Sequence, residues 1–174
     1  MKLIVPKATA KKLISMGVID DVTLTYTKNS AVFKSDEYTI YTRLIEGKYF
    51  AYQKMFTEGE INTCASRTAL IGAMTRAKMC TEEKQPAVFQ IEDDVLNISI
   101  RDKLADYQEQ VPLQETVCKS IRLGFDSRLV LETLKAFTCD NIALGFTSPR
   151  TPMIVEAEDS DMKAMVLPVA IREA

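Results

Sequence analysis

Hydrophobic and polar residues recur with regular periods along most of this chain. Residues 2–5, which are apolar after Lys2, predict a short strand, and residues 7–16 carry apolar side chains at helical spacing. Pro6 suits the start of that helix because a proline there loses no hydrogen bond. Residues 22–27 alternate apolar side chains with threonine, which is the period of a half-buried strand. Two further strands are predicted at residues 31–34 and 38–45.

A second region with regularly spaced apolar residues begins after the polar residues 57–60. Ser66 is a suitable N-cap for a helix that ends near Cys80, since Leu70, Met74 and Ala77 recur at helical spacing. Three strands are predicted after this helix, at residues 87–92, 95–100 and 105–111. Polar turns at Asp93-Asp94 and Asp102-Lys103 separate them.

The third stretch repeats this order. A strand at residues 120–125 precedes Asp126, a good N-cap, and a helix that runs to Phe137. Three alternating segments then predict strands at residues 141–146, 153–158 and 164–171.

The chain therefore consists of three similar β-α-β-β-β units. Residues 20–27 match residues 140–147 at a constant offset of 120, and each segment directly follows a predicted helix. The predicted class is α+β, with helices on one face and antiparallel sheets on the other.

The composition of the chain limits the class of protein to which it can belong. The chain has 174 residues, of which 47% are hydrophobic, enough for a sizeable core. No apolar run approaches the length of a membrane span and no signal-peptide pattern is present, so we expect a cytoplasmic protein.

The absence of histidine removes most catalytic arrangements, including triads and dyads that need an imidazole base. The four cysteines are widely spaced, which argues against a metal site, and six glycines form no phosphate-binding loop. We therefore expect no cofactor, no metal and no enzymatic activity.

Charge is distributed unevenly. The three predicted helices carry eight basic residues against Asp126 and Glu132, a net charge of +6, although the whole chain has a net charge of −2. A basic helix layer on an acidic protein indicates contact with a polyanion through that face, although basic residues also serve simply to keep a helix surface soluble. The predicted DNA-facing residues are Lys7, Lys11, Lys12, Arg67, Arg76, Lys78, Arg128 and Lys135.

Several segments resemble one known family. Residues 43–49, followed by Tyr52, resemble the domain-junction motif of the bacterial sliding clamp, the β subunit of DNA polymerase III. Residues 121–126 and 129–135 are similar to the last helix region of that clamp, and residues 165–169 are similar to its C-terminal tail. The resemblance covers the chain from end to end but only the C-terminal half of a clamp.

This resemblance implies a DNA-clamp fold with two parts: residues 1–56 as the second half of a middle domain, and residues 57–174 as a complete C-terminal domain. It also implies a DNA polymerase processivity factor that encircles or contacts duplex DNA without sequence specificity. Clamps tether polymerases and other partners through a peptide-binding cleft. The positions that match this cleft are Phe50, Lys54, Met55, Met165, Leu167, Pro168 and Val169.

The chain departs from the family in places. Phe50-Ala51 replaces the usual Pro-Asp, and Ala170 stands where the tail usually has arginine. Met79 and Cys80 match positions that contact a neighbouring subunit. We expect a homo-oligomer, most simply a dimer in which residues 1–56 pair with another copy. The alternative is a truncated clamp relative that binds peptides without encircling DNA.

Overall fold

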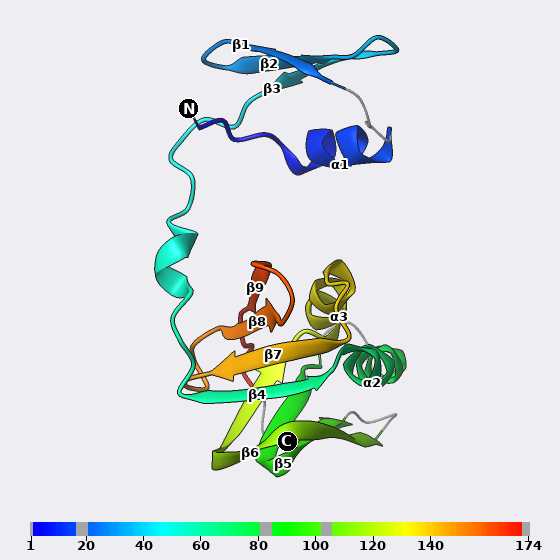
Figure 1. Cartoon of the computed structure of the whole chain (residues 1–174), viewed down its shortest axis with the longest axis vertical. Coiled ribbons are helices and arrows are strands. Elements are labelled where there is room, and N and C mark those ends of the chain that lie inside the picture. Colours follow the sequence, from blue (N-terminus) through cyan, green and yellow to red (C-terminus); the bar gives the residue numbers. More distant parts are fainter. Residues whose placement is uncertain (1, 17–20, 81–84, 102–105, 172–174) are drawn as a thin grey trace. The chain divides into compact units, whose positions relative to one another are not determined.

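The computed structural model describes residues 2–16, 21–80, 85–101 and 106–171. The chain forms two compact units, Met1–Ala51 and Tyr52–Ala174, which are described separately (Figure 1). Parts of three predictions lie outside the described residues: residue 20 of the repeated segment 20–27, the turn at residues 102–103, and residue 105 of the strand predicted at 105–111.

Unit 1 contains α1 (Lys7–Ser15) and an antiparallel sheet in the order β1 (Thr23–Tyr26), β2 (Ser30–Lys34) and β3 (Thr39–Arg43). Cross-strand pairing places the apolar members of the alternation on one face, together with Thr42. The hydroxyl oxygens of Thr42 and Thr9 lie 2.7 Å apart in a hydrogen bond, which joins that face to α1. The helix therefore covers the expected face of the sheet.

Two predictions for unit 1 are wrong. Residues 2–5 are not a strand, because the main-chain N–H of Ile45 donates one 2.9 Å bond to Ile4 and no ladder forms among the described residues. β1 is not half-buried: Leu24 and Tyr26 are 39% and 48% exposed. A nine-residue helix is only about 14 Å long and cannot cover three strands.

Unit 2 contains a larger antiparallel sheet with the order β5-β6-β4-β7-β8-β9. Its helices are α2 (Arg67–Met79) and α3 (Ser127–Ala136), and the short 3₁₀-helix η1 (Tyr52–Met55) precedes them. The six strands are β4 (Ile61–Ser66), β5 (Ala87–Arg101), β6 (Asp106–Phe125), β7 (Asn141–Phe146), β8 (Met153–Ala157) and β9 (Lys163–Val166).

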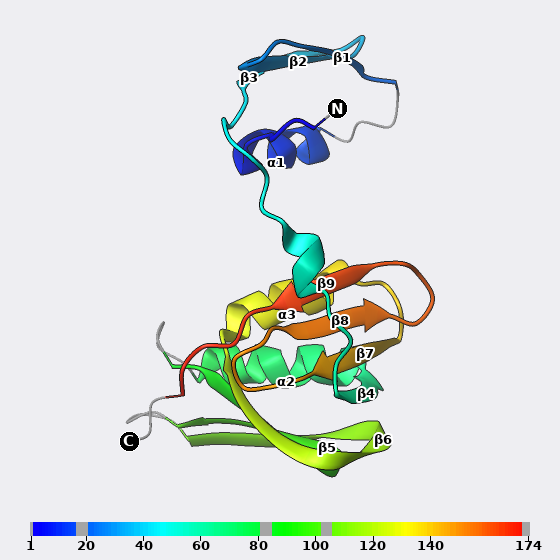
Figure 2. The same ribbon diagram turned by 90° about the vertical axis from the view of Figure 1, so that its left-hand side faces the viewer.

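The helices of unit 2 begin and pack as the sequence predicts. Ser66 accepts a 3.4 Å hydrogen bond from the N–H of Ala69, and Asp126 accepts a 2.8 Å bond from the N–H of Arg128. The predicted apolar faces are buried against the sheet and against each other. Figures 1 and 2 show α2 and α3 next to each other along the sheet.

The strands of unit 2 differ from the prediction at three places, the first being that β9 ends at Val166 and not at residue 171. Residues 87–92 and 95–100 form one strand, β5, and the expected turn at Asp93 is a bulge with φ of 52°. Residues 106–111 and 120–125 belong to one strand, β6, which pairs with β5 on both sides of the bulge. The polar residues between these two segments are largely exposed. The sequence there therefore lacks the regular alternation of apolar and polar residues that would predict a strand. Figure 2 shows the curvature of this long pair.

Candidate functional site

The eight predicted DNA-facing residues lie on three helices. Lys7, Lys11 and Lys12 are exposed on α1 in unit 1. The other five are on α2 and α3, which contact each other in unit 2. The fold therefore gathers these five charges on one helix layer, and their environments differ.

Arg67 is partly buried and is held by the protein itself. Its Nε donates a 2.7 Å hydrogen bond to the carbonyl oxygen of Cys139, between α3 and β7. This contact fixes the start of α2 relative to the end of the neighbouring helix. The Nε donor of Arg67 is therefore occupied by a contact within the protein.

Arg76 forms a bidentate ion pair with Glu109 of β6. The Nε and Nη2 atoms lie 2.7 and 2.5 Å from the two carboxylate oxygens. The hydrogen bonds from Arg76 hold the pKa of Glu109 below its ordinary value, and Glu109 raises the pKa of Arg76. The positive charge of Arg76 is therefore largely balanced within the protein.

Tyr107 completes this cluster. Its hydroxyl donates to the Ala73 carbonyl oxygen at 2.9 Å and also contacts the carboxylate of Glu109. Burial, followed by the hydrogen bond to Glu109, raises the pKa of Tyr107 to about 12. Sequence reasoning missed both residues, because a Tyr-x-Glu spacing on a strand carries no sign of a partner on a distant helix.

The remaining predicted DNA-facing residues of unit 2 lie on the exposed parts of α2 and α3. Arg128 approaches Asp126 at 3.5 Å, so the N-cap carboxylate offsets part of its charge. Lys135 is exposed in the last turn of α3, where a positive charge also favours the helix dipole. Lys78 is exposed near the end of α2.

The predicted peptide-cleft residues are divided between the units. Phe50 is in unit 1 and exposed, whereas Lys54 and Met55 form part of η1 in unit 2. Met165 is partly buried in β9. The tail after β9 exposes 58% of Leu167 and 42% of Val169, with Pro168 partly buried between them.

The predicted oligomer contact lies at the end of α2. Met79 is the last residue of the helix and is 82% exposed, which is unusual for a large apolar side chain. Cys80 is the C-cap and is partly buried. The described part of the chain has no group of three or more potential metal ligands, and none of its helices has the length and apolarity for a membrane span.

The fold and these surfaces can be compared with known proteins. The family model of the "DNA polymerase III beta subunit, C-terminal domain" matches residues 56–170, well over half of the chain. The chain belongs to the DNA polymerase III β-subunit family. The curated relatives include the "Beta sliding clamp" of Staphylococcus aureus strain Mu50, 24% identical over 155 residues, and that of Halalkalibacterium halodurans, 25% identical over 140 residues.

These alignments cover 86% and 78% of this chain but only 41% and 37% of the relatives, so the chain spans about two fifths of their length. Solved structures of β subunits have the same fold. The subunit from Pseudomonas aeruginosa aligns with a TM-score of 0.89 at 20% identity, and that from Streptococcus pneumoniae with 0.88 at 19%. Each alignment covers 98% of this chain, with 48% and 47% of the solved chains. The predicted α+β clamp fold is confirmed.

Proposed function

We propose that this chain acts as part of a sliding clamp, which encircles or contacts duplex DNA without reading its sequence and tethers a DNA polymerase. The observation that carries the proposal is the side-by-side packing of α2 and α3, whose exposed faces hold Lys78, Arg128 and Lys135. In this proposal the chain acts by binding, and no residue takes part in catalysis.

Lysine and arginine on helices suit this task because phosphates present a uniform line of negative charge. Contacts to phosphates hold a protein on DNA without fixing its position along the sequence. The bound protein can then move along the duplex. The cations of α1 would contribute in the same way from unit 1.

Partner binding in this proposal uses the exposed apolar residues. Leu167 and Val169 of the tail, with Met55 and Met165, supply adaptable apolar contacts for short peptides. Lys54 of η1 belongs to the same proposed set. Self-association would use Met79 and Cys80 at the end of α2.

The test is retention on closed circular duplex DNA. A clamp stays on a circle through gel filtration at moderate salt and is lost when a restriction enzyme cuts the circle. Combined alanine substitution of Lys11, Lys12 and Lys78 should weaken binding and flatten its dependence on salt, and adding Arg76→Ala should have a smaller effect because Glu109 balances its charge. An unchanged salt dependence would show that the helix faces are only solvated.

A second candidate function is a peptide-binding module that does not encircle DNA. The exposed tail residues Leu167 and Val169 favour it, because they need no ring to be accessible. This module would bind polymerase-derived peptides and show the same low retention on cut and uncut circles. The experiment above therefore separates the two functions.

A further inference from the structure

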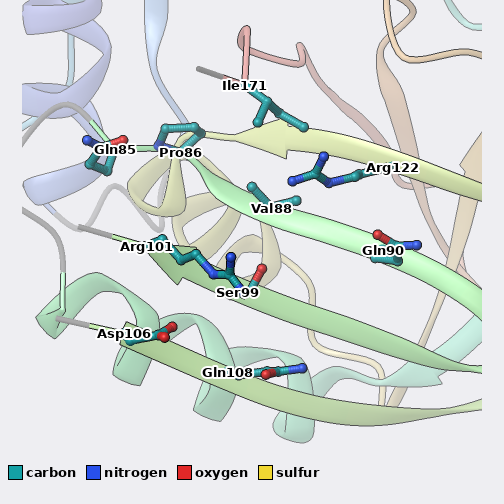
Figure 3. Close-up of a pocket in the computed structure, with 10 residues that line it drawn as sticks. All are labelled: Gln85, Pro86, Val88, Gln90, Ser99, Arg101, Asp106, Gln108, Arg122 and Ile171. Atoms are coloured by element: carbon teal, nitrogen blue, oxygen red, sulfur yellow. The ribbon is translucent and has the colours of Figure 1, made fainter. Parts of the chain in front are cut away.

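A polar groove lies on β5 and β6, on the side of these strands away from their buried side chains. Its volume is about 590 Å³, within the range of ligand sites. Figure 3 shows that Val88 and Gln90 line it from one strand segment, and Ser99 and Arg101 from another. Arg122 of β6 and Ile171 of the tail complete it.

The bulge at Asp93 creates this groove. Val88 and Arg101 are 13 residues apart in β5 and would be about 43 Å apart in a straight strand. They line the same groove because β5 bends where the pairing register shifts on both sides of Asp93. The positive φ of 52° at Asp93 is part of that bend.

The groove contains two arginines with unused donors. Among the described residues, neither Arg101 nor Arg122 has a hydrogen bond or ion pair from its guanidinium. Arg76 and Arg128, by contrast, are matched with carboxylates. Asp106 is the cross-strand neighbour of Arg101 and also lines the groove, but no ion pair joins the two.

One end of the groove is apolar. Pro86, Val88 and Ile171 line it beside the two arginines. β5 is also the end strand of its sheet and pairs only with β6 among the described strands. Figure 3 shows the two halves of β5 next to each other, so an occupant of the groove would meet mainly side chains of the sheet face.

We propose that this groove binds an extended acidic segment of a partner protein. Carboxylates of the segment contact Arg101 and Arg122, and an apolar side chain packs against Pro86, Val88 and Ile171. Arginine is suited to this contact because its planar group meets a carboxylate with two hydrogen bonds. Duplex DNA is excluded as the occupant because a groove of about 590 Å³ is too small to hold it.

This proposal is independent of DNA encirclement. Fluorescence anisotropy of the full chain with a labelled peptide of alternating glutamate and leucine tests it. The matched peptide, with glutamine in place of glutamate, should bind at least about ten-fold more weakly. The double variant Arg101→Gln/Arg122→Gln should lose at least about ten-fold in affinity for the acidic peptide.

Arg150→Gln is the matched control, since Arg150 is exposed in unit 2 and does not line the groove. Its affinity should match the unmodified chain. Amide chemical shifts in the unmodified protein should change at Val88, Gln90 and Ser99 when the acidic peptide is added. This mapping keeps the proposal testable if the double variant does not fold.

Four results of the binding and chemical-shift measurements would overturn the proposal. These are no saturable binding up to about 1 mM peptide, equal binding of the glutamine peptide, an equal loss in Arg150→Gln, or shift changes confined to other strands. Sedimentation provides a further check. If Arg101→Gln/Arg122→Gln dissociates an oligomer of the unmodified chain, the groove is an interface between copies and the acidic-segment proposal is wrong.

Discussion

The main-chain N–H of Val169 donates a 2.8 Å hydrogen bond to the carbonyl oxygen of Gly124, and the two residues form an isolated antiparallel bridge. This bridge ties the tail to β6. A Cβ atom on Gly124 would lie 2.8 Å from the Val169 carbonyl oxygen and 3.0 Å from Cγ1 of Ile171. The tail therefore approaches this closely only because residue 124 has no side chain.

Gly124→Ala is predicted to displace the tail. The new methyl group meets the carbonyl oxygen of Val169, which cannot move without disturbing the bridge, and this should lower the free energy of unfolding by about 1–3 kcal/mol. Urea denaturation measures this change, and faster hydrogen exchange at Val169 locates it. Ser120→Ala, at an exposed position on β6, is the control and should change stability by less than about 0.5 kcal/mol. Equal stability of the Gly124 variant would contradict the proposed close packing.

Glu109→Gln is predicted to strengthen duplex DNA binding. The substitution removes the carboxylate that balances Arg76, so one more cation becomes available to phosphates. The slope of log affinity against log salt should become steeper by about 0.9. Glu115→Gln makes the same charge change at another exposed position on β6 and should leave the slope unaltered. An equal effect in both variants would point to overall charge, not to Arg76.

The contribution of Glu109 to stability should depend on pH. Its pKa is lower in the folded protein than the ordinary value of 4.5, chiefly because of the hydrogen bonds from Arg76. A lowered folded pKa means that this stabilisation is present above the unfolded pKa and is lost as pH falls through the folded pKa. Comparing the unfolding of the unmodified chain and Glu109→Gln at neutral pH and near pH 3 tests this. A difference between them that persists undiminished at the acidic pH would contradict it.

Cys64 and Cys118 should differ in thiol reactivity. Burial, with the nearby carboxylate of Glu158, raises the pKa of Cys64 to about 11, so on the order of one thiol in 10³ is ionised at pH 8. Cys118 is exposed. Alkylation with iodoacetamide followed by mass spectrometry should modify Cys118 first and Cys64 only slowly. Urea should remove the difference, and similar rates in the folded protein would contradict this environment for Cys64.

The sequence predicted most helices and caps because those signals are local. Ser66 and Asp126 act as N-caps at the expected positions, and Leu70, Met74 and Val130 are buried as their spacing requires. Long strands were harder to predict. Asp93 has the local geometry of a turn, but pairing with β6 on both sides continues the strand through it.

Whether an apolar side chain of a strand is buried also depends on the neighbouring strands, which the sequence pattern of that strand does not reveal. The similar segments around Leu24 and Leu144 have the same alternation, yet Leu24 is exposed and Leu144 is buried. Unit 2 surrounds β7 with β4 and β8, whereas β1 is the end strand of a three-stranded sheet. Likewise, the basic composition of α2 was correctly identified, but the ion pair between Arg76 and Glu109 required the tertiary structure.

The exposed face of unit 1 leads to a prediction about self-association. Among its described residues only Ala31 and Thr42 are buried, while Ile14, Leu24 and Tyr26 are exposed and both β1 and β3 are edge strands. Such a unit is marginally stable alone, and a second copy could cover it symmetrically.

Light scattering at micromolar concentration should therefore show a dimer or larger oligomer. Two variants distinguish the surfaces. Leu24→Lys should dissociate an oligomer held through unit 1, because it places a charge on an apolar face that would be buried. Met79→Lys should dissociate one held through the end of α2. Thr25→Lys, on the opposite face of β1, is the control for added charge. A stable monomer of the unmodified chain would contradict both forms of association.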